Sequence, residues 1–246
     1  MSRWFPERLE LWLKPSKAEP LLAAFERELD GRAAAPGTHV TCIVSGEGVR
    51  YGVVPWQSDM ATPAQRHILA EHCFTEAYGD VARGWTLRQH SAGYGAATLA
   101  CAIDTPLLDR LAALMQARRL KLSSVQPALM VAFNAVRRRI DPGMFWFVWV
   151  DGPWTTLLLM SPGEPLHVKR LASATELTRL IEREWFALGI DAPRCPVYVV
   201  RAASAAAAVA RQAPSESGWR VVELPALADG AAHLPGMPAD SRLQAA

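Results

Sequence analysis

The feature that most constrains the fold is a continuous apolar run, M-F-W-F-V-W-V, at residues 144–150. An uninterrupted apolar run of this length is typical of a strand that is covered on both faces. Asp151 and Gly152 then favour a turn into W-T-T-L-L-L-M, and residues 161–163 favour another turn before a strand at 165–171. The second half of the chain is therefore predicted to open with three antiparallel strands.

Helices and strands alternate after these three strands. Ser173 and Glu176 form a capping-box pattern before a helix. A strand over 196–200, an alanine-rich helix over 202–212 and a last strand over 219–224 follow. Three strands followed by helix, strand, helix and strand is the order of a ribonuclease H-like unit, a mixed sheet with helices on its faces.

The first half approximates the same order from residue 38 onward. Residues 38–45 and 49–56 are both strand-like, and Gly46, Glu47 and Gly48 between them predict a β-hairpin. Thr62 and Pro63 predict the start of a helix that ends at Gly79, and further strands and helices follow up to residue 139.

We therefore predict an α/β protein of two tandem ribonuclease H-like (actin-like) lobes with mixed sheets. The first lobe spans residues 38–141 and the second spans 142–224. Residues 1–37 are predicted to form an N-terminal extension with a strand and a helix, and residues 225–246 a mobile tail.

Composition excludes several classes of protein. The 246 residues are half apolar, which is enough for a substantial core, and a net charge of +2 with interspersed signs does not indicate a nucleic-acid partner. The four cysteines are far apart and predict buried free thiols. No apolar run approaches the ~20 residues of a membrane-spanning helix, and no secretory signal is evident, so we expect a cytoplasmic location.

Several segments resemble bacterial actin-like assembly proteins of type IV pilus and type II secretion systems, members of the actin-like ATPase superfamily. They are V-R-Y-G-V-V-P-W (49–56), E-H-C-F-T-E-A-Y-G-D (71–80), W-T-L-R (85–88), L-A-C-A-I-D (99–104) and L-S-S-V-Q-P-A-L-M-V-A-F-N (122–134). The resemblance implies a cytoplasmic scaffold that lies under the inner membrane and works through protein contacts. It implies that this scaffold binds the cytoplasmic segment of a single-pass assembly protein.

Some members of this superfamily bind ATP through an Asp-Gly phosphate loop in each lobe and a glycine pair near the adenosine. This sequence has S-G-E-G (45–48) in place of the first loop and R-A-A-S (201–204) in place of the glycine pair. Asp151, Gly152 and Thr155 match a second phosphate loop, in which Asp151 would hold a metal-bound water. The same residues also fit a hairpin turn that needs no ligand.

We therefore expect a non-enzymatic scaffold without a cofactor. The alternative is an actin-like ATPase or sugar-kinase-like enzyme that binds ATP and Mg²⁺ through divergent phosphate loops. Nuclease chemistry needs several carboxylates around two metal ions, and only Asp104, Asp151 and Glu223 are candidates. His67 and His72 are about 140° apart around a helix, so they cannot share a metal.

Two groups of residues are candidates for partner binding. Trp4 and Trp12 lie near the N-terminus, where they either anchor a partner or pack in the core. Arg137, Arg138 and Arg139 end a predicted helix, where they either meet phospholipid or an acidic partner or remain a solvated helix end.

Overall fold

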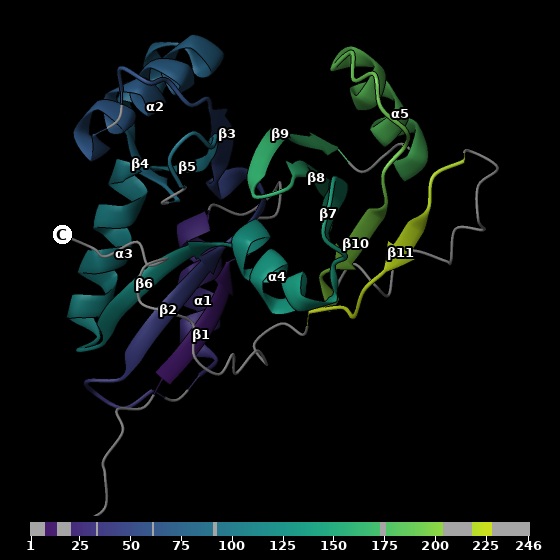
Figure 1. The fold of residues 1–246 in the computed structure, drawn as a ribbon. Helices are drawn as coiled ribbons and strands as arrows, with labels where there is room; N and C mark the ends of the chain where they lie inside the picture. The colour runs from purple at the N-terminus through teal and green to yellow at the C-terminus, as the bar shows by residue number, and fades with distance from the viewer. Residues whose placement is uncertain are drawn as a thin grey trace, which may run out of the picture.

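Three sheets form the framework of the chain in the computed structural model (Figure 1). The structure describes residues 8–13, 21–32, 34–60, 62–90, 93–172, 176–203 and 218–227. Most of the helix predicted over 202–212 and most of the predicted tail lie outside these ranges. No helix within the ranges is long and apolar enough to cross a membrane.

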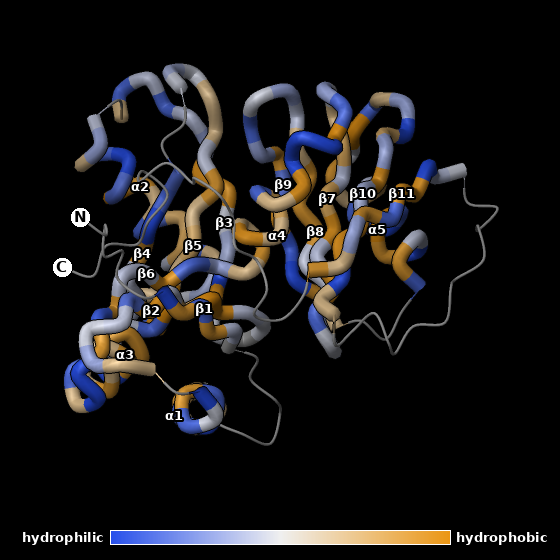
Figure 2. The backbone as a smooth tube through the Cα atoms, turned by 90° about the horizontal axis from the view of Figure 1, so that it is seen from below, coloured by the Kyte–Doolittle hydropathy of each residue, from blue (hydrophilic) through white to orange (hydrophobic). Residues whose placement is uncertain are grey.

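The first sheet is parallel, with the order β1-β2-β6. Its strands are β1 (Arg8–Leu13), β2 (His39–Val44) and β6 (Lys121–Pro127). Helices α1 (Leu21–Asp30) and α3 (Thr105–Ala117) lie on one side of this sheet, where Phe25 and Leu111 are fully buried (Figure 2). The predicted N-terminal extension thus contributes β1 to the same sheet as β2.

The second sheet is antiparallel, with the order β3-β5-β4. Its strands are β3 (Arg50–Val54), β4 (Trp85–Gln89) and β5 (Thr98–Asp104). Helix α2 (Pro63–Tyr78) packs on it, and a 3₁₀ segment, η2 (Asp80–Gly84), leads into β4. Helix α2 starts after Thr62 and ends at Gly79, as the sequence predicts, and Gly79 has a φ of 78°. Thr62 and Gln65 form a capping box at its start.

The predicted β-hairpin over residues 38–56 is wrong. β2 pairs with β1 and β6, whereas β3 pairs with β5 in the second sheet. The connection between them is a single 3₁₀ turn, η1 (Gly46–Gly48), in which Gly46 has a φ of 56°. A short glycine-rich turn can carry the chain into another sheet as well as fold it back on itself, so the turn residues alone did not distinguish the two.

The third sheet has the order β11-β10-β7-β8-β9. Strands β7 (Phe145–Asp151), β8 (Trp154–Ser161) and β9 (Glu164–Ala172) are antiparallel, and β10 (Val197–Arg201) and β11 (Val221–Glu223) run parallel to β7. Every residue of β7 is buried. The order predicted for residues 142–224 is confirmed for the strands and for α5 (Leu177–Ala187).

Helix α4 (Ala128–Val136) packs against both halves of the chain. It follows β6, contacts β2 and β6 of the first sheet, and contacts β7 of the third. Phe133 of α4 lies 6.4 Å from Phe145 and 5.2 Å from Phe147, measured between ring centroids. The apolar run of β7 is thus covered by α4. The predicted α/β class is confirmed, and the third sheet is mixed.

Strands β3 and β9 form a seam between the second and third sheets. Their Cα atoms approach within 8 Å, although no ladder joins them. Glu164, which begins β9, accepts a 2.8 Å hydrogen bond from the backbone N–H of Ala97, just before β5. Arg170, near the end of β9, donates to Val49, just before β3. The two strands therefore run in opposite directions along the seam, and the outer edge of each lies against the other.

Candidate functional site

The turn at Asp151 is the strongest sequence candidate for a ligand site. Asp151 ends β7 and pairs with Trp154, the first residue of β8, so that Gly152 and Pro153 form a two-residue turn. Gly152 has a φ of 56°, which a glycine adopts without strain. The side chains of Asp151 and Thr155 are both buried. This geometry is that of a tight hairpin turn with a buried carboxylate at its base.

The η1 turn takes the place of the first phosphate loop. Ser45, which precedes it, is 2% exposed, and its hydroxyl has no hydrogen-bond partner among the described residues. The backbone carbonyls of Gly46 and Val49 point out of the turn and accept hydrogen bonds from another part of the chain. The turn therefore presents acceptors, whereas a phosphate loop needs N–H donors.

Arg170 of β9 binds both turns. Its Nη1 donates to the carbonyl of Gly46 and, at 3.1 Å, to the carbonyl of Val49. Its guanidinium carbon lies 5.0 Å from the centroid of the Trp154 ring, at the other turn. A guanidinium suits this position because its planar fork of N–H groups binds carbonyls while its face stacks on an indole.

Tyr51 lies at the same place. Burial, first of all, raises the pKa of the Tyr51 phenol above its usual range; the Asp151 carboxylate adds to the rise, and the Arg170 guanidinium opposes it. The phenol is therefore neutral at physiological pH. The Tyr51 ring also packs against both the core of the first sheet and the core around β7. Arg170 therefore links the two turns, and the Tyr51 phenol lies near enough to be influenced by the charges of Asp151 and Arg170.

The sequence analysis did not single out Arg170 or Tyr51. One signal was available for the arginine. Lys169 and Arg170 are consecutive in a strand, and consecutive strand residues point to opposite faces. Each face of β9 therefore carries one positive charge. Lys169 pairs with α5, and Arg170 lies at the seam.

Glu184 is a second buried charge. It is 2% exposed, and it binds Lys169 at 2.9 Å and Arg183 at 3.2 Å. Burial acts to raise the pKa of Glu184, but hydrogen bonds and charge from Lys169 and Arg183 hold it below the usual value. His167 lies 3.6 Å from the same carboxylate, and burial lowers its pKa despite this neighbour. The cluster ties α5 to β9.

Trp12 does not offer an exposed anchor for a partner. Its side chain is 6% exposed, and its ring centroid lies 6.2 Å from that of Trp149 on β7. Of the two roles considered for this tryptophan, the structure supports core packing, because the ring fills the contact between the first and third sheets. Trp4 lies outside the described residues.

Arg137, Arg138 and Arg139 form the 3₁₀ turn η3 (Arg137–Arg139) directly after α4. All three side chains are exposed, and none of them has an ion pair or hydrogen bond within the described residues. They are therefore available to an anionic partner.

The remaining sequence candidates do not converge on a site. His67 pairs with Glu71 at 3.5 Å on the surface of α2. No group of three or more His, Cys, Asp or Glu side chains that could hold a metal occurs within the described ranges. Arg201 binds Glu223 at 2.9 Å, and Ala202 forms a parallel bridge with Leu227, so described residues near the expected glycine pair are engaged in sheet contacts.

Comparison with known proteins identifies the fold. The sequence matches no protein-family model and no curated protein. The structure is similar to the cytoplasmic domain of EpsL, an inner-membrane component of the type II secretion system of Vibrio cholerae, with a TM-score of 0.55 and 10% identity over 89% of each chain.

It is also similar to the PilM-PilN type IV pilus biogenesis complex, with a TM-score of 0.54 and 13% identity over 76% of this chain and 69% of that one. A third match is a protein of unknown function from Bacteroides thetaiotaomicron with an actin-like ATPase fold, at a TM-score of 0.50 and 8% identity over 79% of this chain and 81% of that one. The chain described here therefore has the actin-like ATPase fold.

Proposed function

We propose that this chain is an actin-like scaffold in the inner-membrane platform of a type IV pilus or type II secretion system. It acts at the cytoplasmic side of the membrane by binding a cytoplasmic segment of a single-pass assembly protein. Two of the structural relatives are an inner-membrane secretion component and a pilus biogenesis complex, which supports a role in assembly.

The observation that favours a scaffold over an enzyme is the position of Arg170. Its guanidinium links the η1 turn to Trp154 through two carbonyl hydrogen bonds and a ring contact. Phosphates would need the N–H groups of these turns and the space beside them that the guanidinium of Arg170 occupies. In this proposal a side chain of the protein joins the two halves, and nucleotide is not required.

Two measurements on the purified chain test the proposal. Synthetic peptides covering the cytoplasmic segments of single-pass assembly proteins from the same organism are titrated by calorimetry, and we expect one of them to bind. Mg-ATP is added in a thermal melt, and we expect no shift. A ligand at about 100 times its Kd adds about 2.7 kcal/mol to stability, so binding of ordinary affinity is readily seen.

The second candidate function is an ATPase with divergent phosphate loops. It is favoured by the buried carboxylate of Asp151 beside a glycine with positive φ. A stabilising shift by Mg-ATP that disappears in Asp151→Asn but persists in the matched surface variant Asp191→Asn would support this enzyme and contradict the scaffold. Failure of every peptide to bind would also count against the scaffold.

A further inference from the structure

The first sheet has one face that helices cover and one face that is partly open. Leu9 of β1, Val40 of β2 and Leu122 of β6 pack on the core to which α1 and α3 contribute. Neighbouring residues of a strand point to opposite faces of a sheet. The residue that precedes each of these three on its strand therefore lies on the open face.

A row of basic side chains crosses this open face where the strands begin. Arg8 is paired in register with His39, and His39 is paired with Lys121. Neighbouring strands lie about 4.8 Å apart, so the Cα atoms of the three residues span about 10 Å. Arg8 and Lys121 are exposed, and neither side chain has an ion pair or hydrogen bond within the ranges that the structure describes. We call Arg8, His39 and Lys121 the basic row.

The groups beside the basic row are polar. Nδ1 of His39 is hydrogen-bonded to the hydroxyl of Ser123 at 2.8 Å, and the hydroxyl of Ser124 donates to that of Thr41 at 3.2 Å. Glu10, which follows on the same face of β1, is half-buried, whereas the cations at both ends of the basic row are exposed. A ligand on this surface therefore meets hydroxyl, imidazole and cationic groups, which favours a polar ligand with negative charge.

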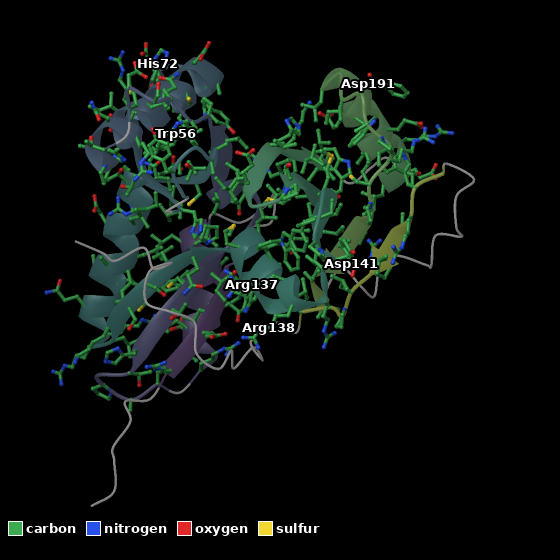
Figure 3. The ribbon with its side chains drawn as sticks, in the orientation of Figure 1. Trp56, His72, Arg137, Arg138, Asp141 and Asp191 are labelled. Carbon is green, nitrogen blue, oxygen red and sulfur yellow. The ribbon has the colours of Figure 1, made fainter. Side chains whose placement is uncertain are left out.

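The open face is bounded by packed structure at its inner end. Trp12 and Ile43, four residues along their strands from the basic row, are buried in the core that includes α4 and β7. The arginines of η3 are not part of the row, since Arg137 and Arg138 lie beside α4 (Figure 3), away from where β1 and β2 begin (Figure 1). A flat bilayer contacts the outermost groups of a protein, whereas a peptide can lie along a sheet face. This placement favours a peptide.

Arg119 adds a further cation at the start of β6, on a strained backbone. Its carbonyl accepts a 2.7 Å hydrogen bond from the N–H of Gly37, and the N–H of Lys121 donates to the carbonyl of Thr38 at 2.9 Å, so this turn lies against the start of β2. Arg119 has a φ of 56°, and no other described residue except glycine has a positive φ. Glycine is usual at such a position after a helix, because a Cβ is strained there. The exposed guanidinium of Arg119 is thus retained at a cost to stability, which favours a role in binding.

We propose that the basic row and Arg119 bind an acidic segment of a partner protein. Alternate residues of an extended chain share a face and recur about every 6.6 Å, so two or three carboxylates on one side of the segment match a row about 10 Å long. Exposed ion pairs are individually weak, so this contact is reversible. The inference rests on the proposed function and deepens it, because it gives the partner's cytoplasmic segment a chemistry and a docking surface.

Fluorescence anisotropy with two labelled synthetic peptides tests the proposal. One peptide alternates glutamate and serine over about ten residues, which is long enough to cross the basic row. The other has glutamine in place of every glutamate. We expect the chain to bind the glutamate peptide and not the glutamine peptide. The binding should weaken as salt rises, because salt screens exposed charges.

Four variants locate the site. R8E and K121E should each weaken binding of the glutamate peptide by roughly fivefold, the effect of one exposed ion pair. The control R110E reverses an exposed cation of α3 that has no ion pair among the described residues, and it should leave the binding unchanged. R119G should weaken the binding without lowering stability, because glycine adopts a φ of 56° without strain. Circular dichroism and urea unfolding check the fold and stability of each variant.

Three results would overturn the proposal: equal binding of the two peptides, no binding of either, or an equal loss of binding in R110E and K121E. Binding to phosphatidylglycerol vesicles without binding to the glutamate peptide would also overturn it and assign these cations to a membrane. Neither peptide comes from an assembly protein. If the glutamate peptide binds at the row but no natural segment binds, the proposed function fails and the site remains. The reverse result removes the site and leaves the proposed function.

Discussion

Nη1 of Arg170 donates a 3.1 Å hydrogen bond to the backbone carbonyl of Val49, across the seam between the two halves. The same atom also binds Gly46, so one side chain on β9 fixes the turn that leads into β3. Because these acceptors are backbone carbonyls, side-chain substitutions in the η1 turn leave the acceptors in place. The hydrogen bonds therefore depend on the side chain of Arg170.

Arg170→Ala should lower the free energy of unfolding by about 2 kcal/mol, since it removes charged hydrogen bonds to partly buried carbonyls. Arg170→Lys should retain part of this, because an ammonium can bind one carbonyl but cannot stack on Trp154 as a plane. Urea unfolding measures both. Arg179→Ala, at a side chain 78% exposed, is the control and should change stability by less than about 0.5 kcal/mol. Similar curves for Arg170→Ala and the control would show that the seam does not depend on this residue.

Trp12→Ala should destabilise the fold by about 3–5 kcal/mol, because it leaves a cavity between the first and third sheets. Trp12→Phe should lower the free energy of unfolding by less. The Trp12 indole N–H has no hydrogen-bond partner among the described residues, so the change to Phe breaks no hydrogen bond. Chemical denaturation followed by circular dichroism measures the difference. A stable Trp12→Ala variant that loses only partner binding would contradict the core role of this residue.

Stability should fall as the pH drops below 6.5. Burial lowers the pKa of His167 below its ordinary value of 6.5, so the unfolded chain takes up a proton first, and acidification from pH 6.5 downward favours unfolding. The pKa of Glu184 is also depressed in the fold, so the stability that it contributes is present above about pH 4.5 and is lost as pH falls further.

His167→Gln separates these two groups. In this variant the loss just below pH 6.5 should be smaller, while the loss at lower pH, due to Glu184, should remain. Urea unfolding at a series of pH values measures both windows. His72→Gln, at an exposed position on α2, is the control and should retain the profile of the parent chain.

Three of the four thiols should react slowly in the folded protein. Burial raises the pKa of Cys42 and Cys101 to about 12 and that of Cys195 to about 11, so the thiolate is scarce at neutral pH. Cys73 is partly exposed on α2, and burial raises its pKa less strongly than that of the other three thiols, so it should be the first to react with a disulfide reagent. Denatured protein should yield all four thiols at once. Rapid reaction of more than one thiol in the folded state would contradict this order.

The order of elements in the second half was predictable because its signals are local. The apolar run at 144–150 and the turns after Asp151 and Ser161 each define one strand or one reversal, and the structure has β7, β8 and β9 there. The partner of a strand is not a local property. The sequence pattern that predicts β2 and β3 therefore also predicts a hairpin between them, although the two strands belong to different sheets.

Contacts between residues far apart in the sequence could not be predicted either. The two hydrogen bonds of Arg170 to backbone carbonyls, for example, join residues more than a hundred positions apart. The arginine triplet was visible because its three members are consecutive.

The seam between β3 and β9 also limits how the two halves can move. A hinge opening at the seam would expose both edge strands to solvent at once. Each edge would then present unpaired backbone N–H and C=O groups that can pair with another chain. Sliding or twisting along the strands keeps both borders shielded. We therefore expect the two halves to move by shear along the strands. A variant in which the seam opens should aggregate.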